Sequence, residues 1–462
     1  MRILLINPPQ GEKYPQPPLG LASIAAILEK NRYDVEILDA NALQLSEVEI
    51  AERVGKSEVV GLTAMTPTIK SAIRIAERIK VTAPDSIVIL GGPHATILPT
   101  ETLSNVPQID IIVMEEGEDT ILELLHALSY SKGLGNVNGI TYRDNGEIKS
   151  TPARPQTLDL DAQPFLPYHL LPMKKYKLHP PYGRESSFMA LMTTRGCPYN
   201  CMYCSKPVFG SKCREQSPKR TADELSYLSN VLKIREVRFY DDVFTLSKER
   251  TVQLTEELNQ RGIDISWSCE TRVNLVSQEL LMRMKTAGCY MIAYGIESGN
   301  QDILDNLRKK ITIEQIEKAV EMTHKAGIQS VGYFMLGSPG ETPETIRQTI
   351  DFAKRLELDF AQFSVTIPFP GTDLYELYLE QGYDPSEWGR FIYTNLNLTN
   401  SPVFETALLS KEDLQEWNAK AYKEFYLRLR YLWLRFTRMR TIGDLKTNIK
   451  GMGMLFDMMR SA

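Results

Sequence analysis

The chain has 462 residues, of which 24% are charged and 43% hydrophobic, and its formal net charge is −5. This length allows two or three domains, and the small acidic charge disfavours a nucleic-acid coat or a basic arm. No apolar run approaches the roughly 18 residues of a membrane helix, and the apolar N-terminus is too short for a signal peptide. We therefore expect a cytoplasmic protein with no integral membrane segment and no nucleic-acid partner.

Residues 1–130 alternate short aliphatic runs with helical stretches. The runs are rich in β-branched residues, which is typical of strands that are buried on both faces. Strands are predicted at 2–6, 34–38, 59–62, 87–90 and 109–114, and helices at 19–31, 68–83 and 120–128. The alternation predicts an α/β fold with a doubly wound, Rossmann-like sheet, whose ligand should bind at the carboxyl ends of the strands.

The segments at these strand ends contain glycine, proline and small hydroxyl residues. They are residues 7–9 and 14–20, 63–68, 91–96 and 115–118. Small residues allow a bulky planar ligand to approach the backbone closely. After them, residues 131–185 read as a linker, with a hairpin signal at 141–147 and a proline-rich stretch at 152–181.

Three cysteines lie close together in the run Thr-Arg-Gly-Cys-Pro-Tyr-Asn-Cys-Met-Tyr-Cys: Cys197, Cys201 and Cys204. Three thiolates on one loop can hold a [4Fe–4S] cluster by three irons and leave the fourth iron open. Zinc would need a fourth ligand, and the nearby Cys213 has no partner in sequence. Because the residues before 197 and after 289 contain no cysteine, auxiliary clusters in the flanks are disfavoured.

From residue 188 onward strands and helices alternate again. Strands are predicted at 190–193, 236–240, 265–270, 291–294, 329–335 and 360–366. At the cysteine motif, including Tyr203, the chain resembles the radical S-adenosylmethionine (SAM) superfamily. The resemblance implies a partial (β/α)6 barrel over 186–375, a cluster held by the three cysteines, and reductive cleavage of SAM at the open iron. It also implies an electron donor such as ferredoxin or flavodoxin.

Several strand ends of this predicted barrel resemble SAM-binding elements of that superfamily. The residues predicted to bind SAM are Tyr203, Glu270, Arg272, Glu297 and Ser298. The planar fork of an arginine suits a carboxylate such as that of the methionyl group. The alternative is that Glu297 and Arg272 form structural ion pairs at the barrel rim.

The segments at 91–96 and 116–118, with the proline-rich segment before Leu19, resemble the cobalamin-binding domain of the B12-binding class of radical SAM enzymes. The resemblance implies a cobalamin domain over 1–130 with these contacts: Pro15, Thr63, Thr66, Gly91, Gly92, His94, Glu116, Gly117 and Glu118. Residues 9–18 contain no histidine, so no histidine ligand is expected on the lower face of cobalt. His94 could instead ligate cobalt, contact the corrin or make structural hydrogen bonds. The alternative for this domain is a flavodoxin-like module that binds nothing.

Residues 376–462 are predicted to be a helical domain. The stretch 422–440 interleaves aromatic and aliphatic residues with five arginines. Such a helix can cover the barrel with its apolar face, and this is the interpretation we favour. The alternatives are that it lies on a membrane surface or faces an acidic partner.

Both resemblances together imply a cobalamin-dependent radical SAM C-methyltransferase that passes a methyl group from SAM, through methylcobalamin, to an unactivated carbon. The alternatives are a non-methylating enzyme of the same class, catalysing cyclisation, ring contraction or lipid carbon–carbon coupling, and a cluster-bearing scaffold without turnover. The substrate is expected to be a peptide or protein side chain, a lipid or another small molecule. One hypothesis is a glutamine of methyl-coenzyme M reductase.

Overall fold

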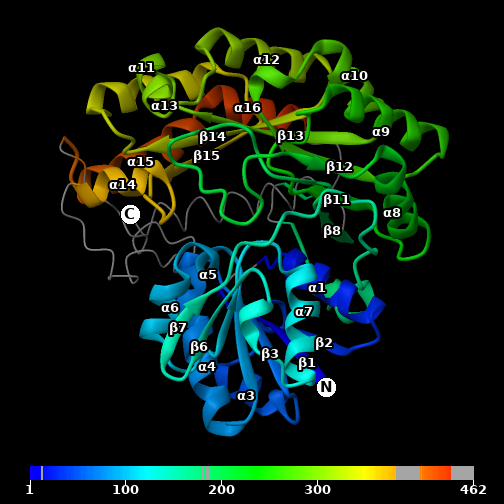
Figure 1. The fold of residues 1–462 in the computed structure, drawn as a ribbon. Coiled ribbons are helices and arrows are strands. Elements are labelled where there is room, and N and C mark those ends of the chain that lie inside the picture. Colours follow the sequence, from blue (N-terminus) through cyan, green and yellow to red (C-terminus); the bar gives the residue numbers. More distant parts are fainter. Residues whose placement is uncertain (12–13, 179–181, 184–186, 381–405, 407, 439–462) are drawn as a thin grey trace.

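The structure, a computed structural model, describes residues 1–11, 14–178, 182–183, 187–380, 406 and 408–438. Two sheets dominate it, one in the N-terminal part of the chain and one in the part that follows (Figure 1). The first sheet has seven strands in the order β2-β1-β3-β4-β5-β6-β7. Its strands are β1 Arg2–Asn7, β2 Asp34–Asp39, β3 Val59–Thr63, β4 Ile87–Gly91, β5 Ile111–Val113, β6 Ile140–Asp144 and β7 Glu147–Ser150.

The five parallel strands of this sheet have the flavodoxin-like order 2-1-3-4-5, so the chain direction across the sheet switches between β1 and β3. Helices cover both faces because alternate residues of each strand are apolar on either side, as Leu4 and Leu5 are. The helices are α1 Leu19–Lys30, α2 Ala40–Leu43, α3 Glu47–Val54, α4 Ile69–Thr82, α5 Pro93–Ile97, α6 Pro99–Asn105 and α7 Gly117–Ser129. The predicted doubly wound sheet is confirmed.

The second sheet has six parallel strands in the order β15-β14-β13-β12-β11-β8. The strands are β8 Phe188–Leu191, β11 Glu236–Phe239, β12 Ser266–Thr271, β13 Cys289–Glu297, β14 Gln329–Leu336 and β15 Phe360–Val365. The outer helices are α8 Pro218–Asn230, α9 Lys248–Gln260, α10 Gln278–Thr286, α11 Gln301–Asn306, α12 Ile313–Lys325 and α13 Pro343–Arg355. This is the predicted partial (β/α)6 barrel.

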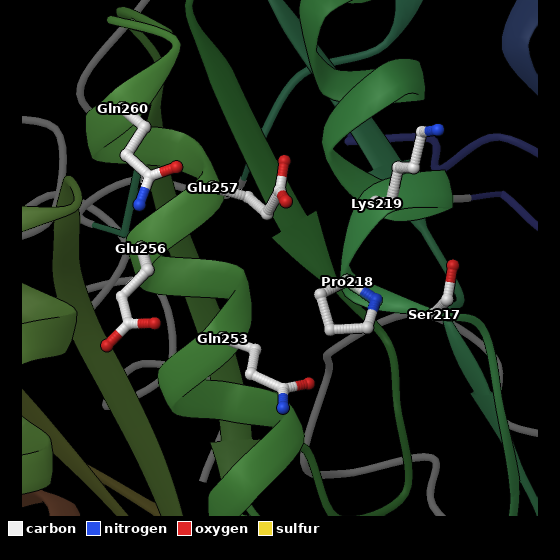
Figure 2. A pocket seen from close by; sticks show the side chains of 7 residues that line it. All are labelled: Ser217, Pro218, Lys219, Gln253, Glu256, Glu257 and Gln260. Carbon is white, nitrogen blue, oxygen red and sulfur yellow. The ribbon is translucent and has the colours of Figure 1, made fainter.

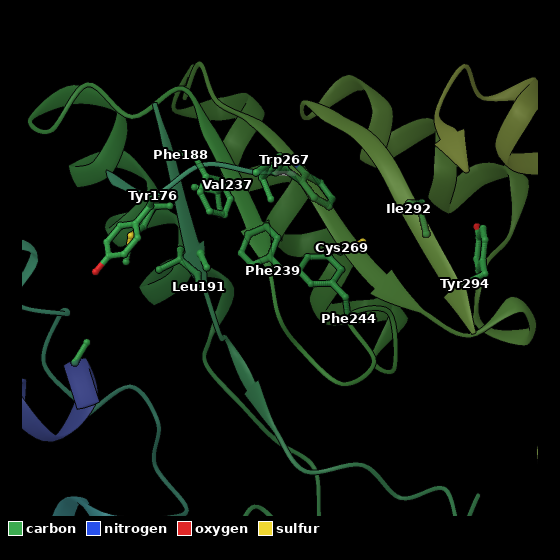
Figure 3. Close-up of a cluster of buried hydrophobic side chains, with 14 of the residues drawn as sticks. Tyr176, Phe188, Leu191, Val237, Phe239, Phe244, Trp267, Cys269, Ile292 and Tyr294 are labelled. Carbon is green, nitrogen blue, oxygen red and sulfur yellow. The ribbon is translucent and has the colours of Figure 1, made fainter. Parts of the chain in front are cut away.

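The barrel strands pack their outward side chains against these helices. Phe239, Phe244 and Trp267 form the aromatic centre of this layer, with ring centroids 4.7 to 5.6 Å apart (Figure 3). Cys269 and Cys289 are buried in the same layer. They behave as small apolar residues there.

The region predicted as a linker does more than connect the two sheets. Its hairpin, β6 and β7, pairs antiparallel with β5 and extends the first sheet. Tyr168, Leu171 and Tyr176 are buried in a core that is continuous with both sheets. A short apolar run and a turn signal predict a hairpin, but the tertiary packing decides which sheet it joins.

After α14, Asp373–Glu380, the described C-terminal elements are α15 Lys411–Tyr426 and α16 Leu429–Arg438. The hydroxyl of Tyr422 donates to the carbonyl of Phe363 and accepts from its N–H, and Tyr426 does the same with Ala361. β15 is an edge strand, and an edge strand has backbone N–H and C=O groups without partners in the sheet. The two tyrosine hydroxyls satisfy some of these groups. The favoured interpretation, that residues 422–440 cover the barrel, is confirmed at Tyr422, Tyr426 and Tyr431, whose hydroxyls bond to barrel backbone groups. Leu429 and Trp433 of α16 are instead 85% and 66% exposed, and residues 439–440 lie outside the described residues.

Candidate functional site

The cysteine motif forms a loop between two short strands. β9, Thr194–Arg195, pairs antiparallel with β10, Arg214–Glu215, and so closes the base of the loop. Gly196 begins the loop with φ +91°, and a Cβ there would lie 2.4 Å from the carbonyl oxygen of Lys212. Only glycine fits this backbone, so the residue before the first cysteine is fixed by the turn itself.

The thiols of Cys197, Cys201 and Cys204 are free of disulfides. Burial raises the pKa of the Cys197 thiol, and raises that of Cys204 to about 11. A nucleophilic cysteine needs a lowered pKa, whereas a bound metal deprotonates its thiol outright. The loop therefore fits metal ligation better than covalent catalysis.

Within the described ranges, no three His, Cys, Asp or Glu side chains are placed to hold a single metal ion. The thiolates of a [4Fe–4S] cluster bind separate irons, so its three ligands do not converge on one point. Three thiols on one closed loop therefore fit this kind of ligation.

Tyr203, between the second and third cysteines, reaches the end of β13. Its hydroxyl donates to Glu297 Oε1 over 2.8 Å, and Lys309 Nζ donates to both the hydroxyl (2.9 Å) and that carboxylate (2.7 Å). Glu297 and Lys309 are 6% and 5% exposed. The structure thus brings two predicted SAM residues together, with a buried ion pair that cross-links the cysteine loop to the barrel.

Arg272, at the end of β12, also borders the cysteine loop. Its Nη1 lies 3.6 Å from Cys201 Sγ, and its guanidinium stacks on the Tyr199 ring at 3.8 Å. Its Nη2 donates to the carbonyl of Lys309. Arg272 therefore holds the loop and the segment after α11 together, and the alternative of a simple rim ion pair does not describe it.

The other two predicted SAM residues have different surroundings. Glu270 precedes Arg272 by two residues on β12, and its Oε1 accepts a hydrogen bond from Arg238 Nη2 over 2.6 Å. Ser298 is fully buried, and its hydroxyl hydrogen-bonds Thr349 on α13 at 3.0 Å. These hydrogen bonds lead to other partners than Tyr203 and Glu297, so the predicted contact of Glu270 and Ser298 with SAM stays a prediction.

The N-terminal sheet presents its carboxyl edge at the β1/β3 switch point, where an open α/β sheet binds its ligand. His94 is fully buried there, and its Nδ1 lies 3.2 Å from Thr66 Oγ1. Burial lowers the pKa of His94 to about 4, so the ring is neutral at physiological pH. Of the three roles considered for His94, this contact supports the structural one directly.

The predicted Gly-Gly turn follows β4. Gly92 has φ +95°, and a Cβ there would lie 2.8 Å from both the Ala64 carbonyl oxygen and Thr63 Oγ1. The protein itself therefore requires this glycine, because the turn packs against the end of β3. Pro15 is buried, and a Cβ on Gly91 would lie 3.6 Å from the Val113 carbonyl oxygen, an ordinary contact.

Replacement of Gly92 by alanine is expected to lower the free energy of unfolding by about 1–3 kcal/mol, because the left-handed backbone and the close contact are both penalised. Chemical denaturation of the cofactor-free protein measures this. Gly20→Ala is the control, because Gly20 lies in α1 with nothing within 4 Å of its Cβ position, and alanine is the better helix former there. Equal stabilities of the Gly92 variant and the wild type would contradict the packing role.

Glu116 and Glu118, predicted to contact cobalamin, pair instead with the base of the cysteine loop. Arg195 donates to Glu116 Oε2 and Glu118 Oε1, each over 2.6 Å, and Arg214 Nη1 lies 2.5 Å from Glu116 Oε1. Ser23 adds a bond to Glu118. The side chains of both glutamates are no more than 7% exposed, so these carboxylates join the two halves of the molecule.

A second contact brings the same two parts together. A Cβ on Gly371 would lie 3.2 Å from Ile97 at the end of α5 and 3.4 Å from the hydroxyl of Ser205, next to Cys204. Gly117, also predicted to bind cobalamin, packs α7 on α1, since its Cβ would lie 3.1 Å from Ile24. The carboxyl edge of the first sheet and the cysteine loop therefore meet.

A separate pocket lies outside the barrel between α8 and α9 (Figure 2). It is lined by Ser217, Pro218, Lys219, Gln253, Glu256, Glu257 and Gln260. None of the predicted site residues lines it. In the parts of the chain that the structure describes, each helix is too short or too polar to cross a bilayer.

Sequence reasoning missed three site residues: Lys309, Arg195 and Arg238. Lys309 lies in the run Arg308-Lys309-Lys310, and such a run usually indicates a solvated surface. Arg195 lies inside the cysteine motif, two residues before Cys197, and this position could have drawn attention to it. Arg238 lies in a predicted strand with apolar neighbours, and a lone cation there indicates a charge that faces a barrel interior.

Comparison with known proteins gives two matching families. The B12 binding domain family matches residues 13–125, and the radical SAM superfamily matches residues 191–353. The chain is 37% identical over 443 residues to an uncharacterized methyltransferase of Pyrococcus horikoshii, which covers 94% of each chain. It is 30% identical over 456 residues to the anaerobic magnesium-protoporphyrin IX monomethyl ester cyclase of Rubrivivax gelatinosus, covering 95% of this chain and 80% of the cyclase.

Among solved structures, the fold is similar to the radical S-adenosylmethionine methyltransferase TsrM of Kitasatospora setae, solved with cobalamin and a [4Fe–4S] cluster. The TM-score is 0.69 at 21% identity, and the match covers 82% of this chain and 78% of TsrM. At this identity the likeness concerns the fold, which agrees in its B12-binding sheet, barrel and C-terminal helices.

Proposed function

The chain belongs to the B12-binding radical SAM family, and we propose that it is a C-methyltransferase that transfers a methyl group from SAM to an unactivated carbon. Its cofactors are a [4Fe–4S] cluster, SAM and cobalamin. When bound, the cluster and SAM supply the radical that activates the substrate carbon, and cobalamin supplies the methyl group. An electron donor such as ferredoxin or flavodoxin would serve the cluster.

One observation carries this proposal: the carboxyl edge of the first sheet is fixed against the cysteine loop. The bonds from Arg195 to Glu116 and Glu118 are short, charged and buried. Methyl transfer to a carbon radical needs both cofactor sites to face one substrate. The protein must therefore hold the two sites in a fixed position relative to each other. A B12-binding module that only stabilises the barrel would not need this edge to meet the loop.

The residues then have these proposed tasks. Cys197, Cys201 and Cys204 ligate the cluster. Tyr203, Glu297 and Arg272 are assigned to the SAM-facing side of the loop, while Lys309 pairs with the Glu297 carboxylate and holds it in position. Thr63, Thr66, Gly91 and Gly92 form the small-residue edge that a planar cofactor can approach. No histidine is proposed below cobalt.

The second candidate is a non-methylating enzyme. It is favoured by the 30% identity, over most of both chains, to a protein that is a cyclase. The substrate of this chain remains a proposal in either case: a peptide or protein side chain, a lipid or another small molecule. A glutamine of methyl-coenzyme M reductase stays a hypothesis of this kind.

The test starts with anaerobic reconstitution with iron, sulfide and hydroxocobalamin, followed by desalting. We expect roughly one cobalamin and one four-iron cluster per chain. With reductant and SAM, the methyltransferase should form both 5′-deoxyadenosine and S-adenosylhomocysteine. Formation of 5′-deoxyadenosine alone would favour the non-methylating enzyme, and no 5′-deoxyadenosine would indicate a scaffold. A cluster without bound cobalamin would contradict the methyltransferase proposal.

A further inference from the structure

A group of polar side chains lies inside the barrel and has no part in the roles assigned above. On β11, Val237 and Phe239 pack outward against the helices, so Arg238 between them points into the barrel. On β12, Trp267 and Cys269 are likewise in the outer layer, and Glu270 points inward. These two side chains and Tyr333 of β14 form one cluster.

Arg238 is the centre of this cluster. Its Nη2 donates to Glu270 Oε1 (2.6 Å) and to the Tyr333 hydroxyl (2.9 Å), and Tyr333 donates to the same Oε1 over 3.2 Å. Arg238 is 9% exposed, and its buried Nε has no hydrogen-bond partner among the described residues. A buried donor without a partner is unfavourable, so a ligand that accepts a hydrogen bond from this Nε would bind more tightly.

The cluster is reachable from outside. The side chain of Glu270 is 34% exposed, and its partner Tyr333 is partly buried, whereas Arg238 is buried. Both described bonds of its carboxylate use Oε1, which leaves Oε2 as a further acceptor. Arg238 and Glu270 together therefore present a donor and an acceptor side by side.

The cluster lies two residues before the predicted cofactor residues along the barrel strands. Arg272, whose guanidinium lies 3.6 Å from Cys201 Sγ, follows Glu270 by two residues, which is about 6.6 Å along a strand. On the other side, Tyr240 follows Arg238 by two residues, and its hydroxyl donates to Gln16 Oε1 of the N-terminal part over 3.0 Å. A molecule anchored at Arg238 would thus extend toward both cofactor sites.

Below the cluster, the barrel is closed by apolar side chains. These form a buried group with Tyr333 packed against it: Tyr290, Met291, Ala293, Val331 and Phe360. The polar groups beside this floor are fully buried: the Tyr290 hydroxyl donates to Glu236, and Ser268 is 1% exposed. Arg238 and Glu270 lie nearer the open end, and the partly exposed Glu270 carboxylate makes them the polar groups that an entering molecule meets first.

The charges decide which polar group fits. Glu270 already neutralises Arg238, and the Asp242 carboxylate lies close enough to Glu270 for the two negative charges to repel each other. An added carboxylate or phosphate would meet these negative charges in a low-dielectric interior. A neutral group that has both an acceptor and a donor avoids this cost.

Resting on the proposed function, we propose that Arg238, Glu270 and Tyr333 anchor the methyl acceptor by a carboxamide group. The carboxamide oxygen accepts from Arg238, and its NH2 donates to Glu270. Arg238 and Glu270 then determine specificity, and they take no part in the chemistry.

The test uses the full chain and two small probes of equal size, propionamide and propionate. Saturation-transfer NMR should detect binding of propionamide and much weaker binding of propionate. In Arg238→Met, affinity for propionamide should fall by roughly tenfold or more, the loss expected for a hydrogen bond to a charged group. Tyr333→Phe, which removes only a hydroxyl, should fold normally and weaken binding by a smaller factor.

Arg235→Met is the matched control, because Arg235 precedes β11 with a 45% exposed side chain paired to Asp264. It should bind propionamide like the wild type. Three results would overturn the inference. They are equal binding of both probes, no binding of propionamide, and propionamide binding that is unchanged in Arg238→Met while Tyr333→Phe is shown to be folded. Turnover of SAM by the wild type is measured separately and tests the proposed function. The proposed function and the carboxamide inference can therefore fail independently.

Discussion

Replacement of Cys201 by serine is expected to abolish the four-iron cluster and with it the cleavage of SAM. A serine hydroxyl is a hard, poorly acidic ligand, whereas iron–sulfur clusters are held by soft thiolates. Loss of supporting groups around a metal site alone costs up to roughly 100-fold, so loss of a direct ligand should lower 5′-deoxyadenosine formation by at least that factor. Iron and sulfide content and the electron paramagnetic resonance of the reduced protein measure cluster occupancy.

Cys213→Ser is the matched control for this prediction. Cys213 lies on the same loop, is partly buried and forms no disulfide, but it is outside the three-cysteine motif. Its variant should keep full iron content and SAM cleavage. If Cys213→Ser lost the cluster and Cys201→Ser retained it, the ligand assignment would be wrong.

The second large effect is expected at Arg195. In Arg195→Met, Glu118 keeps its bond from Ser23 but loses its buried cation, and Glu116 keeps only Arg214. Breaking a buried ion pair from one side costs about 3–5 kcal/mol, and we expect the free energy of unfolding to fall by this amount. Cobalamin retention after desalting should fall as well, because the edge of the first sheet is no longer held to the loop.

The loss should depend on pH. Burial raises the pKa of Glu118, but the Arg195 guanidinium and the bonds from Ser23 and Arg195 outweigh burial and hold the pKa below its usual value. In the wild type this stabilisation is present above the unfolded-state pKa and is lost as the pH falls through the lower folded-state pKa. Without Arg195, burial raises the pKa, so the stability gap between wild type and variant should be largest near pH 7 and shrink toward pH 4.

Arg2→Met is the control for this effect. Arg2, at the start of β1, pairs with Glu36 over 3.2 Å, and the two side chains are 47% and 53% exposed. A pair of this kind contributes about 0–1 kcal/mol, so this variant should be nearly as stable as the wild type at every pH. Equal losses in both arginine variants, measured by urea denaturation from pH 4 to 7, would mean that the Arg195 bridge is no stronger than a surface pair.

Local sequence patterns were enough to predict the features that depend on neighbours along the chain. The C-x3-C-x2-C spacing places three thiols on one loop, and alternating aliphatic runs and helical stretches indicate both parallel sheets, with most strand bounds correct to within two residues. Short elements such as α5 and α6 escaped prediction because they are stabilised by packing under the strand ends, with little helical periodicity of their own.

The pairing of the charged groups, in contrast, depends on how the chain folds. Glu118 and Arg195 are 77 residues apart, Arg238 and Glu270 are 32 apart, and Tyr422 reaches β15 across 59 residues. A glutamate at a strand end looks the same in sequence whether it faces a ligand or an arginine of another domain. The difference lies in burial, because a carboxylate removed from water must find a cation or hydrogen-bond donors in whatever part of the chain the fold brings beside it.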